Sequence, residues 1–513
     1  MTEAQGKREV PGTAGAATKE VILEIGPVAH GGHFVARLAG DAGSTGYADS
    51  AGDTDSMGNA GSAGDRSGAV SDDAAVAGSG LAKASRRVVF VRHAVPGERV
   101  RAILTEAEAD AAFWRADVVE VLAESVEFAG ARVAHFWPEA DSGRAHSAGT
   151  LPIGGAEFGH LRLPAQRALK AMVLAEQLQR LAGLEVTTEV QEVPGEDPTG
   201  LGWRTRTGFA VTPEGRLGMH AHRSHEVIAV QDMPLADRRI RDLALWDLDF
   251  SGLDRVEVAA PTSGDGPLVL LSGTKQAAAR LARELPGGVS AAHWDAKSSR
   301  VSALRGRPWL RESVPATPGS GSAPEFRVSG DGFWQIHRKA PEVLSDTVRA
   351  YLGDFLSAGS AAADLYAGAG LFTSLLADAV GPTGRVLSIE GSPVTSKDAM
   401  RNFDGRAEVL VRPGRVDRVL AAVARENGVL PGAGKLDAVV LDPPRAGAGK
   451  NVVKQICASG ARAVAYVSCD PASFARDVAY FAAEGWQLAE LRAFDLYPNT
   501  HHLETAALLL PTA

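Results

Sequence analysis

The most constraining feature of the sequence is a regular alternation of apolar and helical segments between residues 326 and 513. The apolar segments are AAADLY, GRVLSIE, LDAVVLD, ARAVAYVS and TAALLL, and patterns typical of helices separate most of them. This alternation predicts an α/β domain with a parallel, doubly wound sheet of the Rossmann-like kind. Because ligands of such sheets bind beyond the carboxyl ends of the strands, functional residues are expected directly after each strand.

The rest of the chain predicts two further domains, since one hydrophobic core stops growing at roughly 250–300 residues and the chain has 513. Residues 19–39 alternate apolar and polar positions around a Gly-rich turn and predict two antiparallel strands. Residues 86–106 predict a third strand of the same small β-barrel. Residues 107–315 combine a helical pattern at 165–183 with strand patterns around a Pro-Glu-Gly turn, which favours a central α+β domain.

Two segments are expected to be disordered, namely the tail 1–18 and the stretch 40–84. The stretch consists mainly of Gly, Ala, Ser and Asp, so it cannot bury enough apolar surface to offset the entropy of ordering it. We interpret it as a tolerated insertion in a hairpin of the barrel. Residues 313–325, rich in Pro, Gly and Ser, predict a linker. The predicted organisation is a tail 1–18, a barrel 19–106, a central domain 107–315 and an α/β domain 326–513.

Composition excludes several classes of protein. Hydrophobic residues make up 45% of the chain, but no run approaches the roughly 20 apolar residues of a membrane span. The first residues lack the apolar core of a secretory signal, and two cysteines cannot form a disulfide framework. We expect a cytoplasmic monomer with no membrane contact. The net charge of −9 neither supports nor excludes a nucleic-acid partner, because residues 40–80 alone contain seven aspartates and one arginine.

A candidate ligand site lies at the end of the first predicted strand of the α/β domain. The sequence DLYAGAG there contains Gly368 and Gly370, and small residues let the backbone approach a ligand. Glu390 ends the second strand twenty residues after Gly370, where an acidic side chain can accept hydrogen bonds from both ribose hydroxyls. Thr373 occupies the third glycine position of a dinucleotide-binding motif, so adenosine without a pyrophosphate fits better. S-adenosylmethionine is such a ligand.

Two other strand ends carry candidate reactive groups. The strand LDAVVLD ends in Asp442, and the two prolines that follow fix the backbone where the transferable methyl group would project. The strand ARAVAYVS is followed by Cys469, which places a thiol at the same edge of the sheet. The other cysteine, Cys457, lies in the helical segment KQICASG, where a small buried apolar side chain is expected.

Several motifs of the α/β domain resemble those of the bacterial RNA 5-methyluridine methyltransferases. DLYAGAGLF, LDPPRAG, YVSCDPASFARD and YPNTHHLETAALL occur in the order of that family, together with GFWQIH at 332–337. RSHEVI at 223–228 resembles the central region of the family. The N-terminal barrel resembles a TRAM domain, which is an RNA-binding module of several members.

The resemblance implies S-adenosylmethionine-dependent methylation of uridine carbon 5 in structured RNA, with ribosomal RNA favoured over transfer RNA. The positions that match the family's functional residues are Gln335, Tyr366, Glu390 and Asp442 for the cofactor, Cys469 for the nucleophile and Glu504 for the base. Methylation of carbon 5 of uracil requires both a nucleophile and a base. Carbon 5 of uracil is too weak a nucleophile to attack a sulfonium methyl group, so a thiolate first adds to carbon 6. A base must later remove the carbon 5 proton before the thiolate can leave.

The sequence departs from the family pattern at three places. Many members hold an iron–sulfur cluster with four cysteines, but the corresponding segment 151–166 contains none, and the whole chain has two. We therefore expect no cluster. The residue after the nucleophile is Asp470 instead of the usual Asn, and the residue two positions after the glutamine is His337 instead of Asn. An ionised carboxylate beside Cys469 would raise the pKa of the thiol.

Other interpretations remain open. HHLE at 501–504 contains metal-ligand side chains, but adjacent histidines on a strand point to opposite faces, so we expect no metal site there. In HAHRSHE at 220–226 two of the histidines could meet on one strand face, but we expect an RNA-facing or core role for them. An RNA 5-methylcytosine methyltransferase would also use a cysteine at a strand end, but it typically carries a second cysteine where this chain has Pro444 and Arg445. A non-catalytic RNA-binding protein on the same fold is a third possibility, which a test of methyl transfer to bulk RNA would distinguish.

Overall fold

The computed structural model describes most of the chain. The described residues are 19–38, 87–316, 323–425 and 435–512. The segments 1–18 and 40–84, for which we expect disorder, lie outside this range, and so do residues 317–322 of the expected linker. The described residues form two compact units. Unit 1 contains residues 19–27, 34–38 and 87–127, and unit 2 contains residues 28–33 and the described residues from 128 onward.

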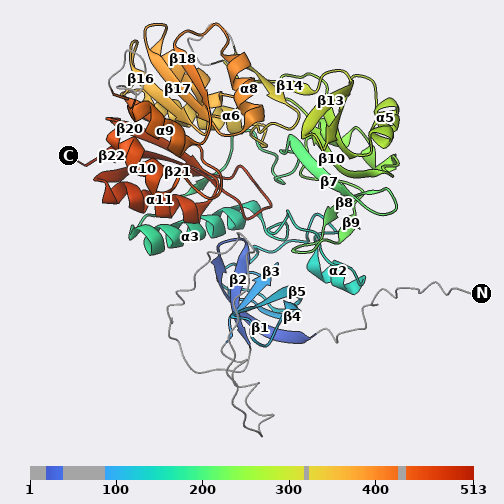
Figure 1. Cartoon of the computed structure of the whole chain (residues 1–513). Coiled ribbons are helices and arrows are strands. Elements are labelled where there is room, and N and C mark those ends of the chain that lie inside the picture. Colours follow the sequence, from blue (N-terminus) through green and yellow to red (C-terminus); the bar gives the residue numbers. More distant parts are fainter. Residues whose placement is uncertain (1–18, 39–86, 317–322, 426–434, 513) are drawn as a thin grey trace, which may run out of the picture. The chain divides into compact units, whose positions relative to one another are not determined.

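Unit 1 contains most residues of a closed barrel with the strand order β1-β2-β3-β5-β4 (Figure 1). Its strands are β1 Glu20–Ala29, β2 His33–Leu38, β3 Val89–Arg92, β4 Arg99–Glu106 and β5 Trp114–Ala123. Apolar side chains alternate along these strands, and Leu23, Ile25, Phe34 and Val91 are buried. The predicted small barrel is confirmed.

The barrel differs from the prediction in two strands. The segment 86–106, predicted as one strand, contains both β3 and β4. A turn separates them, because Gly97 has a φ of 84° and the carboxylate of Glu98 accepts a 2.9 Å hydrogen bond from the amide of Val95. β5 pairs with β3 and β4, so the barrel continues beyond residue 106, where the sequence predicts its end.

The first large sheet of unit 2 has seven strands in the order β13-β12-β11-β10-β7-β8-β9. They are β7 Arg206–Val211, β8 Leu217–His220, β9 Val227–Ala229, β10 Leu253–Ala259, β11 Leu268–Gly273, β12 Ser290–Asp295 and β13 Arg300–Arg305. The strands predicted around the Pro-Glu-Gly turn are β7 and β8. α5 (Lys275–Glu284) packs on this sheet and buries Leu281 in the same core as Phe209 and Leu271. The short elements α2 (Ser142–Ser147), α4 (Arg238–Arg241) and η1 (Leu245–Asp247) belong to the same region.

The second large sheet has eight strands in the order β18-β17-β16-β19-β20-β22-β21-β6. They are β6 Val190–Gln191, β16 Ala361–Leu365, β17 Arg385–Glu390, β18 Val409–Pro413, β19 Ala438–Leu441, β20 Ala463–Ser468, β21 Trp486–Phe494 and β22 Glu504–Pro511. The five strands from β18 to β20 are parallel, which confirms the predicted Rossmann-like sheet. β14 (Trp309–Ser313) and β15 (Glu325–Ser329) pair with each other at the two ends of the expected linker.

One edge of this sheet is not parallel, contrary to the prediction. β22 lies between β20 and β21 and is antiparallel to both. The loop 495–503, which joins β21 to β22, contains no helix. Parallel neighbours need a crossover connection, usually a helix, whereas antiparallel neighbours do not. The reversal of β22 therefore follows from the shortness of this connection.

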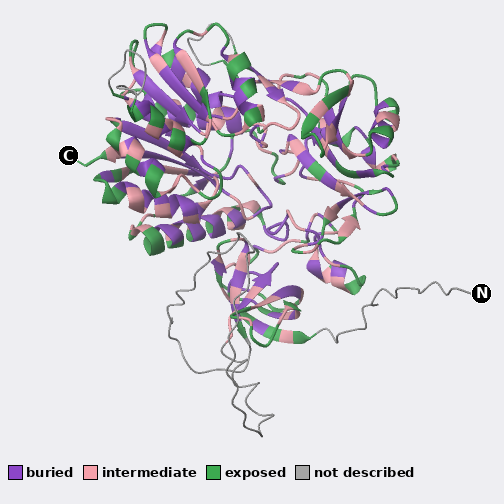
Figure 2. Ribbon diagram, in the orientation of Figure 1, coloured by how far each residue is buried: buried purple, intermediate pink, exposed green. Residues whose placement is uncertain are grey.

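Helices cover both faces of the eight-stranded sheet. Those that share a core with one face are α3 Leu163–Ala182, α9 Val416–Arg425, α10 Gly449–Ala458 and α11 Pro471–Ala483. Those that share a core with the other face are α6 Ala340–Leu352 and α7 Leu371–Val380, while α8 Pro393–Asn402 contacts β15, β17 and β18. Buried residues fill the strands and the inner sides of these helices (Figure 2). α3 confirms the helix predicted at 165–183. In the part of the chain that the structure describes, no helix combines the length and the apolarity that crossing a membrane requires.

Candidate active site

One edge of the eight-stranded sheet brings the predicted functional residues together. The adjacent strands β17, β16, β19, β20 and β22 present there, in this order, Glu390, Tyr366, Asp442, Cys469 and Glu504. β22 runs in the opposite direction to β20, so its first residue lies at the edge where the parallel strands end. All five residues line one cavity of about 810 Å³, and Gln335 and Gly368 line it too.

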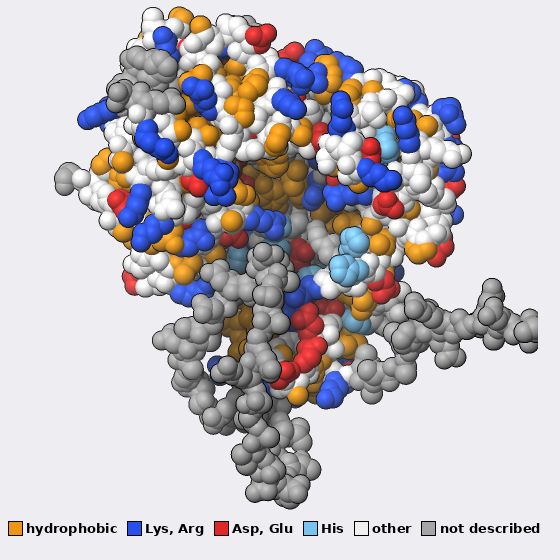
Figure 3. Space-filling model, viewed as in Figure 1, with side chains coloured by type: hydrophobic (Ala, Val, Ile, Leu, Met, Phe, Trp, Pro, Cys, Tyr) orange, Lys and Arg blue, Asp and Glu red, His pale blue; other side chains and the backbone are white. Residues whose placement is uncertain are grey.

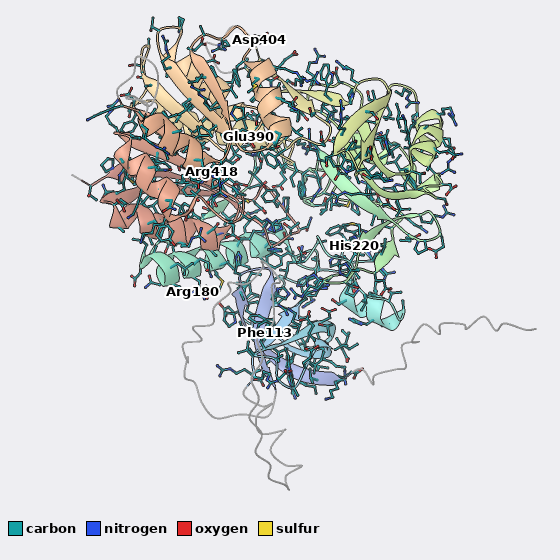
Figure 4. The ribbon with its side chains drawn as sticks, viewed as in Figure 1. Phe113, Arg180, His220, Glu390, Asp404 and Arg418 are labelled. Carbon is teal, nitrogen blue, oxygen red and sulfur yellow. The ribbon has the colours of Figure 1, made fainter. Side chains whose placement is uncertain are left out.

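The turn after β16 is shaped for the close approach of a ligand. Tyr366 and Gly368 have φ angles of 65° and 58°. A non-glycine residue with such a φ is strained, and strain of this kind is concentrated at functional sites. The carboxylate of Glu390 accepts hydrogen bonds from the amides of Gly368, at 2.8 Å, and Ser392. Glu390 ends β17 and is labelled in Figure 4. These two hydrogen bonds fix the position of the turn.

Gly370 does not line the cavity, although the sequence predicts it as a cofactor residue. It directly precedes α7 and has a φ of 103°. A Cβ atom at this position would overlap the ring of Phe403. A glycine is therefore required here by backbone conformation and by packing.

Asp442 follows β19, in the middle of the row of strand ends that line the cavity. Burial raises the pKa of Asp442 to about 7, although a 3.1 Å hydrogen bond from Nε2 of Gln335 to Oδ2 opposes that increase. Gln335 comes from the segment between β15 and α6, as expected from the GFWQIH motif. Asp442 lies between the strand ends that carry Tyr366 and Cys469, so it can face both a cofactor and a reacting base.

The thiol and the predicted base lie on neighbouring strands. Ser468 of β20 pairs with Thr505 of β22, and the two strands are antiparallel. Cys469 directly follows Ser468 and Glu504 directly precedes Thr505, so these two residues lie opposite each other. Burial, together with the carboxylates of Glu504 and Asp442, raises the pKa of Cys469 to about 12. Burial and the charge of Asp442 also raise the pKa of Glu504 well above its usual range. Both groups are therefore easier to ionise when a cation occupies the cavity.

The cavity is lined by buried carboxyl groups, of Asp442 and Glu504. Its buried carboxyl groups favour a cationic ligand, and the sulfonium of S-adenosylmethionine is a cation. Phe333, whose surface is 59% exposed, lines the same cavity beside Gly368 and offers a flat apolar surface for a ring. The space-filling view shows a recess in this face of unit 2, with Lys and Arg side chains on the surface around it (Figure 3).

Several lining residues have no clear signal in the sequence. Trp203 and Arg204 reach the cavity from a distant part of the chain, where no motif marks them. Tyr497 also lines it, and its hydroxyl donates a 2.9 Å hydrogen bond to Oε2 of Glu504. Tyr497 belongs to the motif that contains Glu504, and this shared motif is the one signal that could have identified it.

The two histidines before Glu504 are not on a strand, contrary to the prediction. They lie in the loop 495–503, and their ring centroids are 3.9 Å apart. Nδ1 of His501 lies 3.2 Å from Oε2 of Glu157, while Arg445 donates a 3.0 Å hydrogen bond to Nε2 of His502. Each histidine therefore has its own protein partner. Among the described residues, no group of three or more His, Cys, Asp or Glu side chains could hold a metal ion. His220, of the other histidine-rich segment, is on β8, apart from Glu390 (Figure 4).

Asp470, which replaces the family's usual Asn, has a structural partner. It precedes α11, and its Oδ1 accepts a 2.8 Å hydrogen bond from the amide of Ser473, which caps the helix. Its charge raises the pKa of Cys469, as predicted, but contributes less than Glu504 and Asp442 do.

His337, which replaces the family's second usual Asn, and Cys457 do not line the cavity. His337 is buried and stacks on Trp203, and its Nδ1 accepts a 3.0 Å hydrogen bond from the amide of Lys339. Burial lowers the pKa of His337 to about 3, so the ring is neutral. Cys457 lies on α10, packs against the core and has a pKa raised by burial to about 12. Neither residue lines the cavity.

Comparison with known proteins agrees with this geometry. The family model described as tRNA (Uracil-5-)-methyltransferase matches residues 422–512. An "Uncharacterized RNA methyltransferase" of Streptomyces avermitilis is 36% identical over 507 residues, which cover 96% of this chain and 99% of that protein. The 23S rRNA (uracil(1939)-C(5))-methyltransferase RlmD of Shewanella piezotolerans is 27% identical, over 84% of this chain and 92% of that protein.

A solved structure has the same fold. The Pyrococcus abyssi tRNA (uracil-54, C5)-methyltransferase in complex with S-adenosyl-L-homocysteine has a TM-score of 0.56 and 19% sequence identity, over 82% of this chain and 95% of that chain. The similarity to the Streptomyces protein extends over nearly the whole of both chains, and the family model covers the segment that contains Cys469 and Glu504. The chain therefore belongs to the family of S-adenosylmethionine-dependent RNA uracil-C5 methyltransferases.

Proposed function

We propose that this protein transfers a methyl group from S-adenosylmethionine to carbon 5 of a uridine in RNA, through a covalent adduct with Cys469. The observation that carries the proposal is the order of the strand ends at one cavity. Glu390 and Tyr366 lie on one side, Cys469 and Glu504 lie on the other, and Asp442 lies between them. The first pair suits a nucleoside cofactor, and the second pair suits addition to a base and removal of a proton.

Residues of the first half would hold the cofactor, which supplies an electrophilic methyl group when it is bound. The carboxylate oxygens of Glu390 each have a second lone pair beyond the amide contacts, so they can also accept hydrogen bonds from ribose hydroxyls. Tyr366 and Gly368 form the wall beside that carboxylate. Gln335 and Asp442, which are linked to each other, would orient the cofactor toward Cys469.

Cys469 begins the reaction by adding its sulfur to carbon 6 of the uracil. Burial opposes loss of the thiol proton, whereas the charge of Arg445 favours the thiolate, and a bound cation would favour it further. The new bond converts the ring to an enolate whose carbon 5 is electron-rich enough to attack a methyl group. Covalent attachment thus divides one difficult step into two.

Glu504 completes the reaction after methyl transfer. Its carboxylate removes the proton from carbon 5, and the thiolate of Cys469 leaves carbon 6. A methyltransferase for carbon 5 of cytosine would use a second cysteine at the site, but the other cysteine of this chain, Cys457, is on α10 and does not line the cavity. The position of Glu504 opposite Cys469 supports uridine as the substrate.

Structured RNA is the proposed substrate class, with ribosomal RNA favoured over transfer RNA. The similarity to a ribosomal RNA methyltransferase over 84% of the chain and the N-terminal barrel support this preference. The test is to incubate the purified protein with labelled S-adenosylmethionine and with ribosomal or transfer RNA from a deletion strain. Nucleoside mass spectrometry should find label in 5-methyluridine, mostly in ribosomal RNA. Label in 5-methylcytosine, or no label in either RNA, would contradict the proposal.

Replacement of Glu390 should weaken cofactor binding without unfolding the domain. Glu390→Ala removes the proposed ribose acceptor and one anchor of the turn after β16, so affinity for S-adenosylmethionine should fall at least about tenfold, or ~1.4 kcal/mol. Isothermal titration calorimetry measures the change. Asp404→Ala is the matched control, because Asp404 is exposed and lies apart from Glu390 (Figure 4). Equal affinities in the two variants would remove Glu390 from the cofactor site.

We further propose that the protein contains no iron–sulfur cluster. A cluster of this kind needs four thiolates, and the chain has two cysteines. Protein purified without oxygen should be colourless, and iron analysis should find well below about half an equivalent per chain. A brown protein with a visible charge-transfer band would contradict this expectation.

A further inference from the structure

Tyr497 contacts the proposed base directly. Its phenol hydroxyl donates a 2.9 Å hydrogen bond to Oε2 of Glu504. Tyr497 lies in the loop 495–503, Glu504 begins β22, and both line the cavity that contains Cys469. One carboxylate oxygen of the base is thus engaged by a protein donor, and Oε1 is left to take a proton.

A buried ion pair holds the backbone of Tyr497 in place. Nζ of Lys170, on α3, lies 2.6 Å from Oδ1 of Asp495 and donates a 3.0 Å hydrogen bond to the carbonyl oxygen of Tyr497. Both charged side chains have 0% exposure. A buried pair of this kind is costly to break, because either partner alone would be an uncompensated charge. The start of the loop is therefore fixed to α3.

A second set of bonds from α3 fixes the middle of the loop. Oε1 of Gln166 accepts a 2.7 Å hydrogen bond from the amide of Asn499, and Nε2 of Gln166 donates a 2.9 Å hydrogen bond to Oδ1 of the same residue. Asn499 has a φ of 67°, and its side-chain amide donates to the carbonyl oxygens of Thr199 and Gly200. Hydrogen bonds from α3 thus fix the backbone of the loop on both sides of Tyr497.

The aromatic ring of Tyr497 has contacts that do not depend on its hydroxyl. Its centroid lies 5.9 Å from that of Trp203 and 6.0 Å from that of His502, in both cases in an edge-to-face arrangement. Phenylalanine would keep these contacts. Tyr497→Phe therefore removes one hydrogen bond to Glu504 and leaves the packing of the ring intact.

Burial and a neighbouring carboxylate oppose the ionised form of Glu504. Asp442, at the end of β19, raises its pKa, and burial raises it more. Cys469, which follows β20, lines the same cavity. Arg445 also lines it, and its guanidinium donates a hydrogen bond to His502. The bond from Tyr497 is the contact that lowers the pKa of the base.

We propose that Tyr497 is a positioning residue whose hydrogen bond to Oε2 favours the carboxylate form of Glu504 and leaves Oε1 directed to the proton on carbon 5. This inference rests on the proposed function. In the step concerned, the carbon 5–hydrogen bond breaks and the proton moves to Oε1. The electron pair of that bond forms the double bond between carbons 5 and 6. The bond from carbon 6 to the sulfur of Cys469 breaks, and the thiolate takes its electron pair.

The experiment follows removal of that proton directly. RNA that carries tritium at carbon 5 of uridine is mixed with excess full-length enzyme and S-adenosylmethionine, and tritium release to water is compared with methyl transfer in the same mixture over a range of pH. The rate of release should rise with pH as Glu504 ionises. In Tyr497→Phe the midpoint should move up by about one pH unit, so release is about tenfold slower below both midpoints and close to wild type above them. Methyl transfer should change little.

Two further variants make the result specific. Tyr351→Phe is the matched control, because its hydroxyl bonds the carbonyl oxygen of Ala506 on β22 and not the base, so its midpoint should not move. A fluorotyrosine at position 497 is a stronger donor and should lower the midpoint. An unshifted midpoint in Tyr497→Phe, or an equal loss of rate at every pH, would overturn the inference. Failure of the wild-type protein to release tritium would overturn the proposed function as well.

Discussion

Replacement of the proposed nucleophile should abolish the reaction. In Cys469→Ala no sulfur can add to carbon 6, so carbon 5 is not activated, and the rate of methylation should fall at least about 10⁴-fold. A filter-binding assay with labelled S-adenosylmethionine measures the rate. Denaturing electrophoresis should show no RNA attached to the variant.

Cys457→Ala is the matched control for this prediction. Cys457 is on α10 and packs against the core of the sheet, so its removal should affect stability modestly and leave methylation near the wild-type rate. Calorimetry of the cofactor complex should show that Cys469→Ala still binds S-adenosylmethionine. Methylation by Cys469→Ala at a rate near that of the control would contradict a covalent mechanism.

Replacement of the proposed base should stop the reaction at a later point. Glu504→Gln retains the shape of the side chain and loses the ability to take a proton. Cys469 should still add to the ring and the methyl group should still be transferred, but the proton on carbon 5 would then block release of the thiolate. Turnover should fall about 10²- to 10⁴-fold, and a protein–RNA band that carries the methyl label should accumulate.

Glu490→Gln provides the control for this second variant. Glu490 is an exposed residue of β21, the strand that pairs with β22, so the substitution makes the same chemical change outside the cavity. It should turn over like the wild type and accumulate no labelled band. If Glu504→Gln also turns over normally, a different group removes the proton.

The parts of the site that the sequence predicts are those that local patterns define. Strand periodicity places the ends of β16, β17, β19 and β20, and the edge where parallel strands end is a property of the fold, so Tyr366, Glu390, Asp442 and Cys469 could be assigned to one edge. The same reasoning separates Cys469 from Cys457, because one follows a strand and the other lies within a helix.

The parts that the sequence does not predict depend on contacts between distant segments. The loop 495–503 is fixed by hydrogen bonds from Gln166 and Lys170, which lie more than three hundred residues earlier in the chain. No local sequence pattern predicts contacts between residues so far apart. The contact between Tyr497 and Glu504, and the place of the two histidines on a loop, follow from that anchoring. Likewise, the position of β5 in the barrel depends on its pairing with β3, and the reversal of β22 depends on the length of one connection.

The central claim is that methylation passes through a bond between Cys469 and carbon 6 of a uridine. Tandem mass spectrometry of the labelled band from Glu504→Gln, after digestion with a protease and a nuclease, tests this claim most directly. The claim predicts a peptide containing Cys469 that carries one uridine nucleotide with an added methyl group. The same modification on any other residue, or free 5-methyluridine in RNA with no modified peptide at any time during turnover, would contradict it.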